Sequence, residues 1–325
     1  MGFIVPLCAV SQTAAQETAT LSRFTFSQYH MGVDTRLVVY AKSQTVAEEA
    51  CVAAFARIAE LDSIMSDYRK DSELIRLCAN AGKAPTKVSK DLFKVIERSL
   101  QVSRWSGGAF DISVGPLVSL WRKARKAGEL PGNEEIQSAL RVTGWRRILL
   151  DKQNATIKLT GVGMKLDLGG IAKGYACDQA QVVLKNHGIQ RALVEMGGDI
   201  VVSGPPPGSQ GWTIRVPNAG KGQTAKDMTF ANCAVSTSGD TEQFTVIGGV
   251  RYSHVVDPRT GLALTTRTQA TVVTTTGHWS DPLSTTLTLL DERARKRLMK
   301  RFPGSKSYVK VLKPGALMLN ILGSD

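Results

Sequence analysis

Residues 166–175 read Leu-Asp-Leu-Gly-Gly-Ile-Ala-Lys-Gly-Tyr, and this stretch leads into a predicted helix. The pair Gly169–Gly170 lets the backbone approach a ligand closely, because glycine has no side chain and tolerates unusual backbone angles. The free N–H groups at the start of the helix would face the same ligand, and such groups favour anions. Lys173, in the first turn, adds a positive charge. The stretch therefore predicts a binding site for a pyrophosphate or a similar anion.

The known glycine-rich motifs do not describe this stretch. Its spacing is not that of the GxGxxG dinucleotide fingerprint, and Tyr175 stands where a phosphate-binding P-loop requires lysine. A Gly-Gly pair before a helix can also be only a tight connection. The anion site is a hypothesis that needs support from the rest of the chain.

The surrounding segments alternate between helical and strand patterns without a regular β–α–β order. The first long helix is expected to start at Thr45, which has capping-box spacing to Glu48 and places Val46 on the buried face. The last long helix is expected to start at Asp281–Pro282, because proline favours the first helical position, and to keep Leu298 on its apolar face. Further helices are predicted from residues 89, 133 and 171, a hairpin over 147–160, and strands near 35–41, 191–195, 199–203, 211–216, 250–256 and 269–275. The fold class predicted is α+β, a mixed β-sheet core with flanking helices.

The composition is that of a globular protein with excess positive charge. The 325 residues are 42% hydrophobic, and 41 Lys and Arg against 28 Asp and Glu give a formal net charge of +13. That excess favours anionic partners. Nucleic acid is disfavoured among them, because the densest basic cluster, residues 293–301, has the spacing of an ordinary helix and contains no aromatic residue. The five cysteines form no CxxC pair, which argues against zinc or redox chemistry.

The first 22 residues have the pattern of a targeting segment. Gly2–Val10 is an apolar run followed by small residues, with a candidate cleavage position after Ala15, as in a secretory signal. No Lys or Arg precedes Arg23, so the positive start of such a signal is missing. We expect residues 1–22 to be a signal segment with a truncated or misassigned start, and residues 23–325 to form one domain. A frayed N-terminus is the alternative.

His254 is the strongest candidate for a general base. It ends a predicted strand, Asp257 follows three residues later, and a polar turn ending in Asp240 precedes the strand. Histidine titrates near neutral pH, and a nearby carboxylate can orient its ring. A single histidine is more often structural, and Asp257–Pro258 is also a common turn sequence. The concentration of polar residues favours a catalytic His254 with Asp257 and Asp240 as assisting carboxylates.

Asp281 and Thr285 are four residues apart in a predicted helix, so their oxygens share one face. A carboxylate with a hydroxyl suits Mg²⁺, a hard cation that completes its coordination with waters and ligand phosphates. An N-cap aspartate beside an ordinary helical threonine is the simpler alternative.

A series of motifs, taken in order, resembles the FAD:protein FMN transferase (ApbE-like) family. The motifs are Met31–Gly32, residues 66–73, residues 107–121, Leu166–Tyr175, Gly197–Asp199, Thr237–Asp240, Ser253–Gly261 and Asp281–Thr285. Each is weak alone, but they are collinear and extend from about residue 30 to residue 321. The chain departs from the family at Val33, where Thr is frequent, and at Pro282, where Ala is common.

The resemblance implies an ApbE-like fold and a complete set of site residues. Mg²⁺ would be ligated by Asp281, Thr285 and the carbonyl of Gly170. His254, Asp257 and Asp240 would lie at the reacting centre. FAD would contact Met31, Tyr68, Ala109, Phe110, Asp111, Asp167, Lys173 and the backbone of Val255.

The function that the resemblance implies is Mg²⁺-dependent transfer of FMN from FAD to a Ser or Thr of an acceptor flavoprotein, with release of AMP. The acceptor would be a membrane redox subunit or a secreted flavoprotein, which agrees with a periplasmic or exported enzyme at the inner-membrane surface. An FAD pyrophosphatase that yields FMN and AMP is the alternative enzyme. Tyr68 favours the transferase, because an aromatic ring there would shield FAD from water. A non-catalytic flavin carrier and a basic nucleic-acid-binding protein are weaker alternatives.

Overall fold

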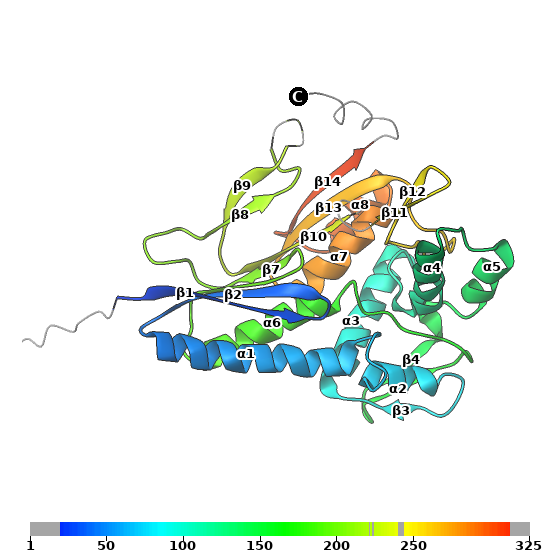
Figure 1. The fold of residues 1–325 in the computed structure, drawn as a ribbon, viewed down its shortest axis with the longest axis horizontal. Coiled ribbons are helices and arrows are strands. Elements are labelled where there is room, and N and C mark those ends of the chain that lie inside the picture. The colour runs from blue at the N-terminus through cyan, green and yellow to red at the C-terminus, as the bar shows by residue number, and fades with distance from the viewer. Residues whose placement is uncertain (1–19, 221, 223, 240–243, 313–325) are drawn as a thin grey trace, which may run out of the picture.

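The computed structural model describes residues 20–312, except 221, 223 and 240–243. Its centre is a seven-stranded sheet in the order β1-β2-β6-β7-β10-β13-β14 (Figure 1). The strands are β1 (Ser22–His30), β2 (Val33–Ala41), β6 (Ala192–Met196), β7 (Asp199–Val202), β10 (Cys233–Gly239), β13 (Arg267–Thr274) and β14 (Lys306–Leu312). Each pairing among these described strands is antiparallel, so the parallel pairs of a mixed sheet are not formed. The predicted α+β class with flanking helices is confirmed.

The two faces of this sheet are covered differently. On one face, Leu37 and Val39 of β2 pack in the core with helices α1 (Gln44–Met65) and α6 (Ala172–Asn186), and helix α7 (Gly277–Leu289) lies beside α6. On the other face, Val38 packs with Trp212 and Val216. These residues belong to β8 (Trp212–Val216), which pairs with β9 (Lys226–Phe230) in a separate hairpin. Alternating side chains on one strand thus contact helices on one side and a hairpin on the other.

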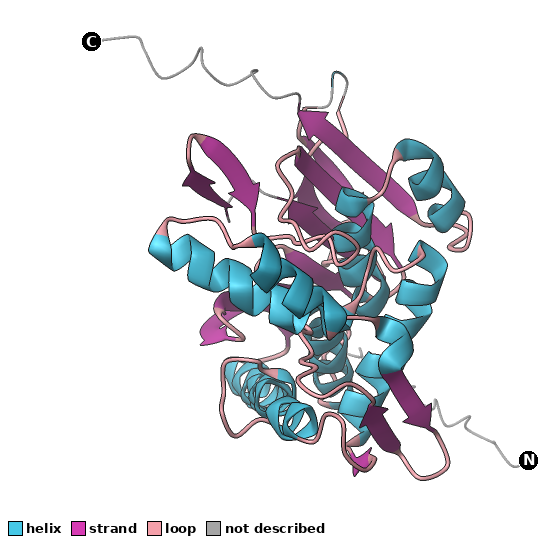
Figure 2. Ribbon diagram, turned by 90° about the vertical axis from the view of Figure 1, so that its right-hand side faces the viewer, coloured by secondary structure: helices cyan, strands magenta, loops and turns pink. Residues whose placement is uncertain are grey.

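A second group of elements is inserted between β2 and α6. It lies at one end of the sheet, in front of the strands in Figure 2. Its elements are α2 (Glu73–Ala79), β3 (Thr86–Lys87), α3 (Lys90–Ser106), η1 (Ile112–Val114), α4 (Gly115–Ala127), α5 (Asn133–Arg141), η2 (Trp145–Arg147), β4 (Ile148–Asp151) and β5 (Thr156–Leu159). Strands β3, β5 and β4 form a small antiparallel sheet. Toward the C-terminus, β11 (Phe244–Ile247) and β12 (Val250–Ser253) form a hairpin, and α8 (Glu292–Met299) follows α7. No helix in the described ranges is long and apolar enough to span a membrane.

Most of the predicted helices and strands are present, and two helix starts are wrong. Helix α1 is capped by Ser43, whose hydroxyl accepts from the N–H of Val46 at 3.3 Å, so Val46 is exposed instead of buried. Helix α7 begins at Gly277, four residues before Asp281, and Pro282 lies inside it. The reason is that Asp178, on α6, accepts from the N–H groups of Gly277 at 2.6 Å and His278 at 3.0 Å. This cap comes from about a hundred residues earlier in the chain.

The apolar face predicted from Leu283 to Leu298 belongs to two helices. The backbone leaves the helical region at Leu290, and Asp291 starts α8 by accepting from the N–H of Ala294 at 2.8 Å. Leu298 still packs in the same core cluster as Leu283 and Leu287. The apolar pattern therefore predicts the burial of Leu298 correctly, but the single helix that it predicts is wrong, because the segment forms two helices.

Asp91 at the start of α3 connects three helices. Its Oδ1 accepts from Arg57 Nη2 of α1 at 2.6 Å and from the Tyr175 hydroxyl of α6 at 2.6 Å. Burial alone would raise the pKa of Asp91, but its hydrogen bonds with Arg57 and Tyr175 outweigh burial and lower that pKa. A carboxyl whose pKa is lowered by folding stabilises the native state above its unfolded pKa and loses that effect as the pH falls through its folded pKa.

We expect Asp91→Asn to lower the free energy of unfolding by about 1–3 kcal/mol at pH 7, because it removes a charged acceptor shared by the partly buried Arg57 and the buried Tyr175. The deficit relative to wild type should shrink as the pH falls below about 4, where the wild-type carboxylate also becomes protonated. Urea unfolding at several pH values measures both effects. Asp71→Asn is the matched control, since its ion pair with Arg69 is exposed and the loss should stay within about 0.5 kcal/mol. A deficit for Asp91→Asn that is independent of pH down to pH 2 would contradict this assignment.

Candidate active site

One cavity of about 1710 Å³ lies between the main sheet and the inserted group of helices. It collects nearly every predicted site residue, although these residues come from distant parts of the chain. Its lining includes Met31, Tyr68, Ala109, Phe110, Asp111, Asp167, Gly170, Lys173, His254, Val255, Asp281 and Thr285. Asp257 is not part of the lining, and Asp240 lies outside the described residues.

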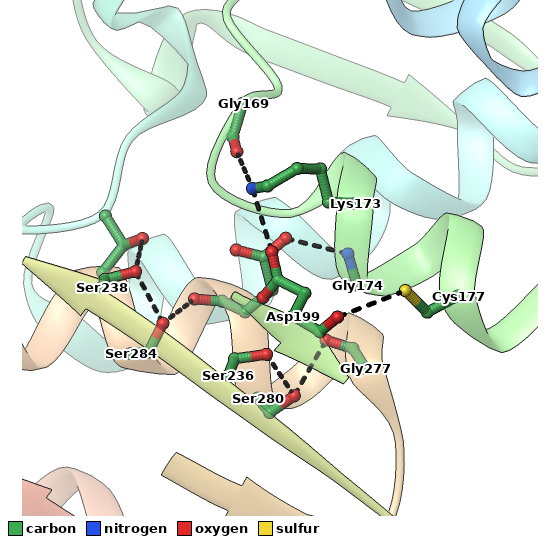
Figure 3. A network of polar contacts seen from close by, with 12 residues as sticks. Gly169, Lys173, Gly174, Cys177, Asp199, Ser236, Ser238, Gly277, Ser280 and Ser284 are labelled. Atoms are coloured by element: carbon green, nitrogen blue, oxygen red, sulfur yellow. Dashed lines mark hydrogen bonds and ion pairs between the residues drawn. The ribbon is translucent and has the colours of Figure 1, made fainter. Parts of the chain in front are cut away.

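The centre of the site is a backbone contact between α6 and α7. A Cβ on Gly174 would lie 2.2 Å from the carbonyl oxygen of Gly277 and 2.7 Å from the Cβ of Asp281. Only glycine permits this approach. It allows the N–H of Gly174 to donate to Asp281 Oδ2 at 2.9 Å, so a carboxylate of α7 occupies one of the free donors at the start of α6 (Figure 3).

Lys173 lies between two buried carboxylates. Its Nζ is 3.0 Å from Asp199 Oδ2 and donates to the carbonyl oxygen of Gly169 at 3.3 Å (Figure 3). Burial alone would lower the pKa of Lys173, but the attraction of Asp199 and Asp281 outweighs burial and raises that pKa, so Lys173 is positively charged. Burial and then repulsion from Asp199 raise the pKa of Asp281. Two carboxylates against one ammonium leave excess negative charge in a buried place.

A set of hydroxyls surrounds this charged cluster. Ser238 Oγ lies 3.0 Å from Thr285 Oγ1 and 2.7 Å from Ser284 Oγ. A Cβ on Gly170 would lie 3.4 Å from Thr285 Oγ1 and 3.2 Å from the ring of Phe110, so Gly170 packs directly against both residues. Asp281 and Thr285 are one turn apart on α7. The structure therefore brings together the three residues proposed to ligate Mg²⁺.

The residues present fit a divalent cation with few protein ligands. A carboxylate, a hydroxyl and a backbone carbonyl are hard oxygen donors of the kind that Mg²⁺ uses when substrate phosphates and waters complete its coordination. A cation would also offset the excess negative charge of Asp199 and Asp281. In the described part of the chain, no group of three or more His, Cys, Asp or Glu side chains is placed to hold a metal without such help.

An exposed aromatic ring stands at the side of the cavity. Tyr68 is 76% exposed, and the guanidinium of Arg122 lies 4.5 Å from the centre of its ring. Arg122 also pairs with Asp67 and lies 3.3 Å from Asp167 Oδ2. Burial and the nearby Asp67 raise the pKa of Asp167. Arg122 thus connects the aromatic ring to a carboxylate inside the cavity, and the sequence analysis had assigned it no role.

Asp111 lines the cavity, but its carboxylate is used within the protein. Oδ1 accepts from the N–H of Ser113 at 2.8 Å and from its hydroxyl at 2.6 Å, and Oδ2 accepts from the N–H of Trp145 at 2.8 Å. Asp111 therefore fixes the shape of this wall, which Ala109 and Phe110 complete. On the opposite side, Met31 has a φ of +48°, an unusual value for a residue other than glycine.

The segment after β12 places His254 and Asp257 differently. His254 is half-buried and lines the cavity. Asp257 is turned away from it, because its carboxylate accepts from the N–H of Arg259 at 2.9 Å, from Nε at 2.9 Å and from Nη2 at 2.7 Å. The N–H of Val255 donates to Ser253 Oγ at 3.1 Å. Asp257 therefore builds the turn after the strand, and the structure does not place it beside His254 in the cavity.

Asp199 is a central residue of the site whose role its sequence motif does not indicate. It ends the Gly197–Asp199 motif, and its side chain is 5% exposed against Lys173. A buried aspartate is unusual unless it is paired. Its burial could have been inferred only from the position of its strand in the centre of the sheet.

Comparisons with known proteins agree with this geometry. A model of the ApbE family matches residues 31–309. A protein of Treponema pallidum (strain Nichols) named FAD:protein FMN transferase is 30% identical over 315 residues, which cover 92% of this chain and 86% of that protein. A protein of the same name from Haemophilus influenzae is 30% identical and covers 90% and 87%. The solved structure of the flavinyl transferase ApbE from Pseudomonas stutzeri matches with a TM-score of 0.79 at 28% identity, over 90% of this chain and 92% of that one.

We expect Gly174→Ala to lower the free energy of unfolding by about 1–3 kcal/mol, because the added methyl group forces α6 and α7 apart. Gly132→Ala is the matched control, since a Cβ there makes its nearest contact at 3.4 Å, with the flexible end of Glu135. Thermal and urea unfolding of both variants measure the difference. Equal stability of Gly174→Ala and wild type would show that the two helices are not in backbone contact.

Proposed function

Because this chain belongs to the ApbE family, we propose that it transfers the FMN half of FAD to a Ser or Thr hydroxyl of an acceptor protein and releases AMP. The observation that carries the proposal is the buried cluster of Lys173, Asp199 and Asp281 at the start of α6, inside a cavity that also holds His254. The names of the similar proteins from Treponema pallidum and Haemophilus influenzae support the same activity.

The proposed reaction exchanges the phosphoanhydride bond of the FAD pyrophosphate for a phosphoester bond to the acceptor. The acceptor hydroxyl oxygen attacks the phosphorus of the FMN half, and the bond from that phosphorus to the oxygen bridging to AMP breaks. AMP leaves with the bridging oxygen, and the hydroxyl proton passes to a base. His254 is the proposed base, because it is the titratable side chain beside the cavity whose ordinary pKa lies near neutrality.

The charged cluster would stabilise the pyrophosphate of FAD. Lys173 is held in position by Asp199 and Gly169, and its raised pKa keeps it charged, so it presents a fixed positive charge at the cavity. Asp281, Thr285 and the carbonyl of Gly170 would hold Mg²⁺. When bound, Mg²⁺ neutralises phosphate charge and helps the AMP oxygen to leave.

The two ends of FAD have candidate contacts on either side of this cluster. Met31 and the exposed ring of Tyr68 offer apolar and aromatic surface, Asp167 lies beside Tyr68 through Arg122, and Ala109 and Phe110 form a further wall. Asp111 contributes by shaping that wall. Val255 would contribute through its backbone. Asp257 has no part in the proposed chemistry because Arg259 holds its carboxylate.

We further propose that the protein acts in the periplasm or another exported location, with a flavoprotein at the membrane or in the same compartment as its acceptor. The support is the apolar run and the small residues before residue 22. Residues 1–19 of this segment lie outside the described residues.

His254→Asn should bind FAD within several-fold of wild type and transfer FMN at least about a hundredfold more slowly, because a lost general base costs about 10² to 10⁴ in rate. Quenching of flavin fluorescence measures FAD binding, and covalent flavin in an acceptor measures transfer. The wild-type rate should also rise with pH near neutrality, and this rise should be missing in the variant. A variant that loses FAD affinity but keeps its turnover at saturating FAD would make His254 a binding residue.

Asp281→Asn should keep the fold and lose the response to Mg²⁺. The amide oxygen of asparagine can still accept from the N–H of Gly174, so the contact between α6 and α7 survives. With FAD present, wild type should gain thermal stability on addition of MgCl₂, and Asp281→Asn should gain little or none. Its transfer rate should require at least about tenfold more Mg²⁺, because one of few protein ligands is missing. An unchanged Mg²⁺ dependence in both measurements would exclude Asp281 as a ligand.

A further inference from the structure

The cavity continues from the charged cluster onto the other face of the main sheet. Five residues there form one row across five neighbouring strands, because each is directly paired with the next. The row is Ser27, Arg36, Glu195, Ile200 and Val235. All five line the cavity, as do Ile214 and Arg215 of the β8–β9 hairpin. We call this part of the cavity, with the row as its floor and Ile214 and Arg215 as its wall, the outer chamber.

The dimensions of the outer chamber suit an extended polypeptide. Val235 is 3% exposed and packs with Ile214 in one core cluster, so the accessible part of the row extends from Ser27 to Ile200 across four strands. Neighbouring strands lie about 4.8 Å apart, so this part spans about 14 Å, the length of about four extended residues. The whole cavity, at about 1710 Å³, is also larger than the range of about 300–1,000 Å³ that is usual for one small ligand. FAD on the helix side therefore leaves room for a second substrate.

Two glycines separate the outer chamber from the charged cluster. Gly197 and Gly198 form the turn between β6 and β7, with φ values of +52° and +91°, and Asp199 follows directly. A Cβ on Gly197 would lie 2.7 Å from the side chain of Val33. The glycines add no side chain of their own at this turn, so the passage from one part of the cavity to the other is bounded by their backbone and by the side chain of Val33.

The floor of the outer chamber also carries polar groups that can discriminate between peptides of different sequence. Arg36 Nε and Nη2 lie 2.8 Å and 2.5 Å from the same oxygen of Glu195, Oε2. The two side chains are 48% and 30% exposed, so both reach the cavity while paired to each other. A fixed pair of opposite charges on the floor can contact backbone amides or one charged side chain of a peptide.

We propose that the outer chamber binds the acceptor protein as an extended segment of about four residues, which presents its Ser or Thr across the Gly197–Gly198 turn. This inference rests on the proposed function and names the surface that recognises the acceptor. The occupant is a polypeptide and not the distal part of FAD, because the residues assigned to FAD lie on the other side of the turn.

A peptide library provides the probe. Eleven-residue peptides with a central Thr and randomised neighbours, fixed on beads, are incubated with the full chain, FAD and MgCl₂, and beads that acquire flavin fluorescence are sequenced. In parallel, a host lysate is tested for proteins that acquire covalent flavin. Labelling of a lysate protein but of no peptide overturns the outer chamber as a site for a short segment. Labelling of neither overturns the proposed function itself, and with it this inference.

The consensus peptide is then used with a variant that fills the outer chamber. Ser27→Trp adds a large side chain at an exposed position of the floor, and it should reduce kcat/KM for the peptide at least tenfold through KM while FAD affinity stays unchanged. Thr25→Trp is the matched control, because Thr25 is exposed on the same face of β1 but does not line the cavity. Peptide kinetics that Ser27→Trp leaves unchanged, or a loss of FAD affinity in that variant, would overturn the proposal.

A charge exchange tests selection by the floor. The double variant Arg36→Glu with Glu195→Arg keeps the ion pair but reverses its direction, so the consensus peptide should change at one or two positions. Glu292→Lys with Lys296→Glu is the control, because it reverses an equally close but exposed pair on α8. The same consensus from both double variants and wild type would show that the Arg36–Glu195 pair does not contact the acceptor.

Discussion

The backbone contact between α6 and α7 at Gly174 and Gly277 is the constraint on which the site depends. Because neither residue has a side chain, Asp281 comes close enough to accept the N–H of Gly174. The same approach places Thr285 against Gly170 and brings Asp281 near Lys173. Asp178 of α6 reinforces it, since its carboxylate caps α7. One helix crossing thus joins the glycine-rich start of α6 to the oxygen donors of α7.

This crossing creates a charge imbalance that the protein alone does not remove. Burying two carboxylates beside one ammonium is unfavourable, because a low dielectric strengthens repulsion and removes hydration. The raised pKa of Asp281 expresses that cost. A divalent cation would offset this excess negative charge, so the site would be more stable with a cation bound. Met31 is a second position beside the cavity that costs local stability, because its positive φ is unfavourable for a residue other than glycine.

Local patterns predicted most of the fold and located the site, but tertiary contacts decided the roles of several residues. Ser89 caps α3 as expected, and the glycines of residues 166–175 lead into a helix beside the charged cluster of Lys173, Asp199 and Asp281. Asp257 could not be assigned from its motif, because the pattern does not tell a catalytic carboxylate from one held by Arg259. Asp178 capping α7 and Arg122 beside Tyr68 had no local signal at all. Such roles require knowing which helices meet.

The position of the β6–β7 turn explains how one cavity could serve two substrates. A transferase must hold its nucleotide donor close to the acceptor and still keep water from replacing the acceptor. In this fold the proposed donor side lies among helices, whereas the proposed acceptor side lies on the other face of the sheet beside the β8–β9 hairpin, and the Gly197–Gly198 turn lies between them. An acceptor chain lying in the outer chamber would cover the open side of the cavity. Binding of the correct acceptor would then exclude water at the moment when its hydroxyl arrives, so that the acceptor itself would limit hydrolysis of FAD.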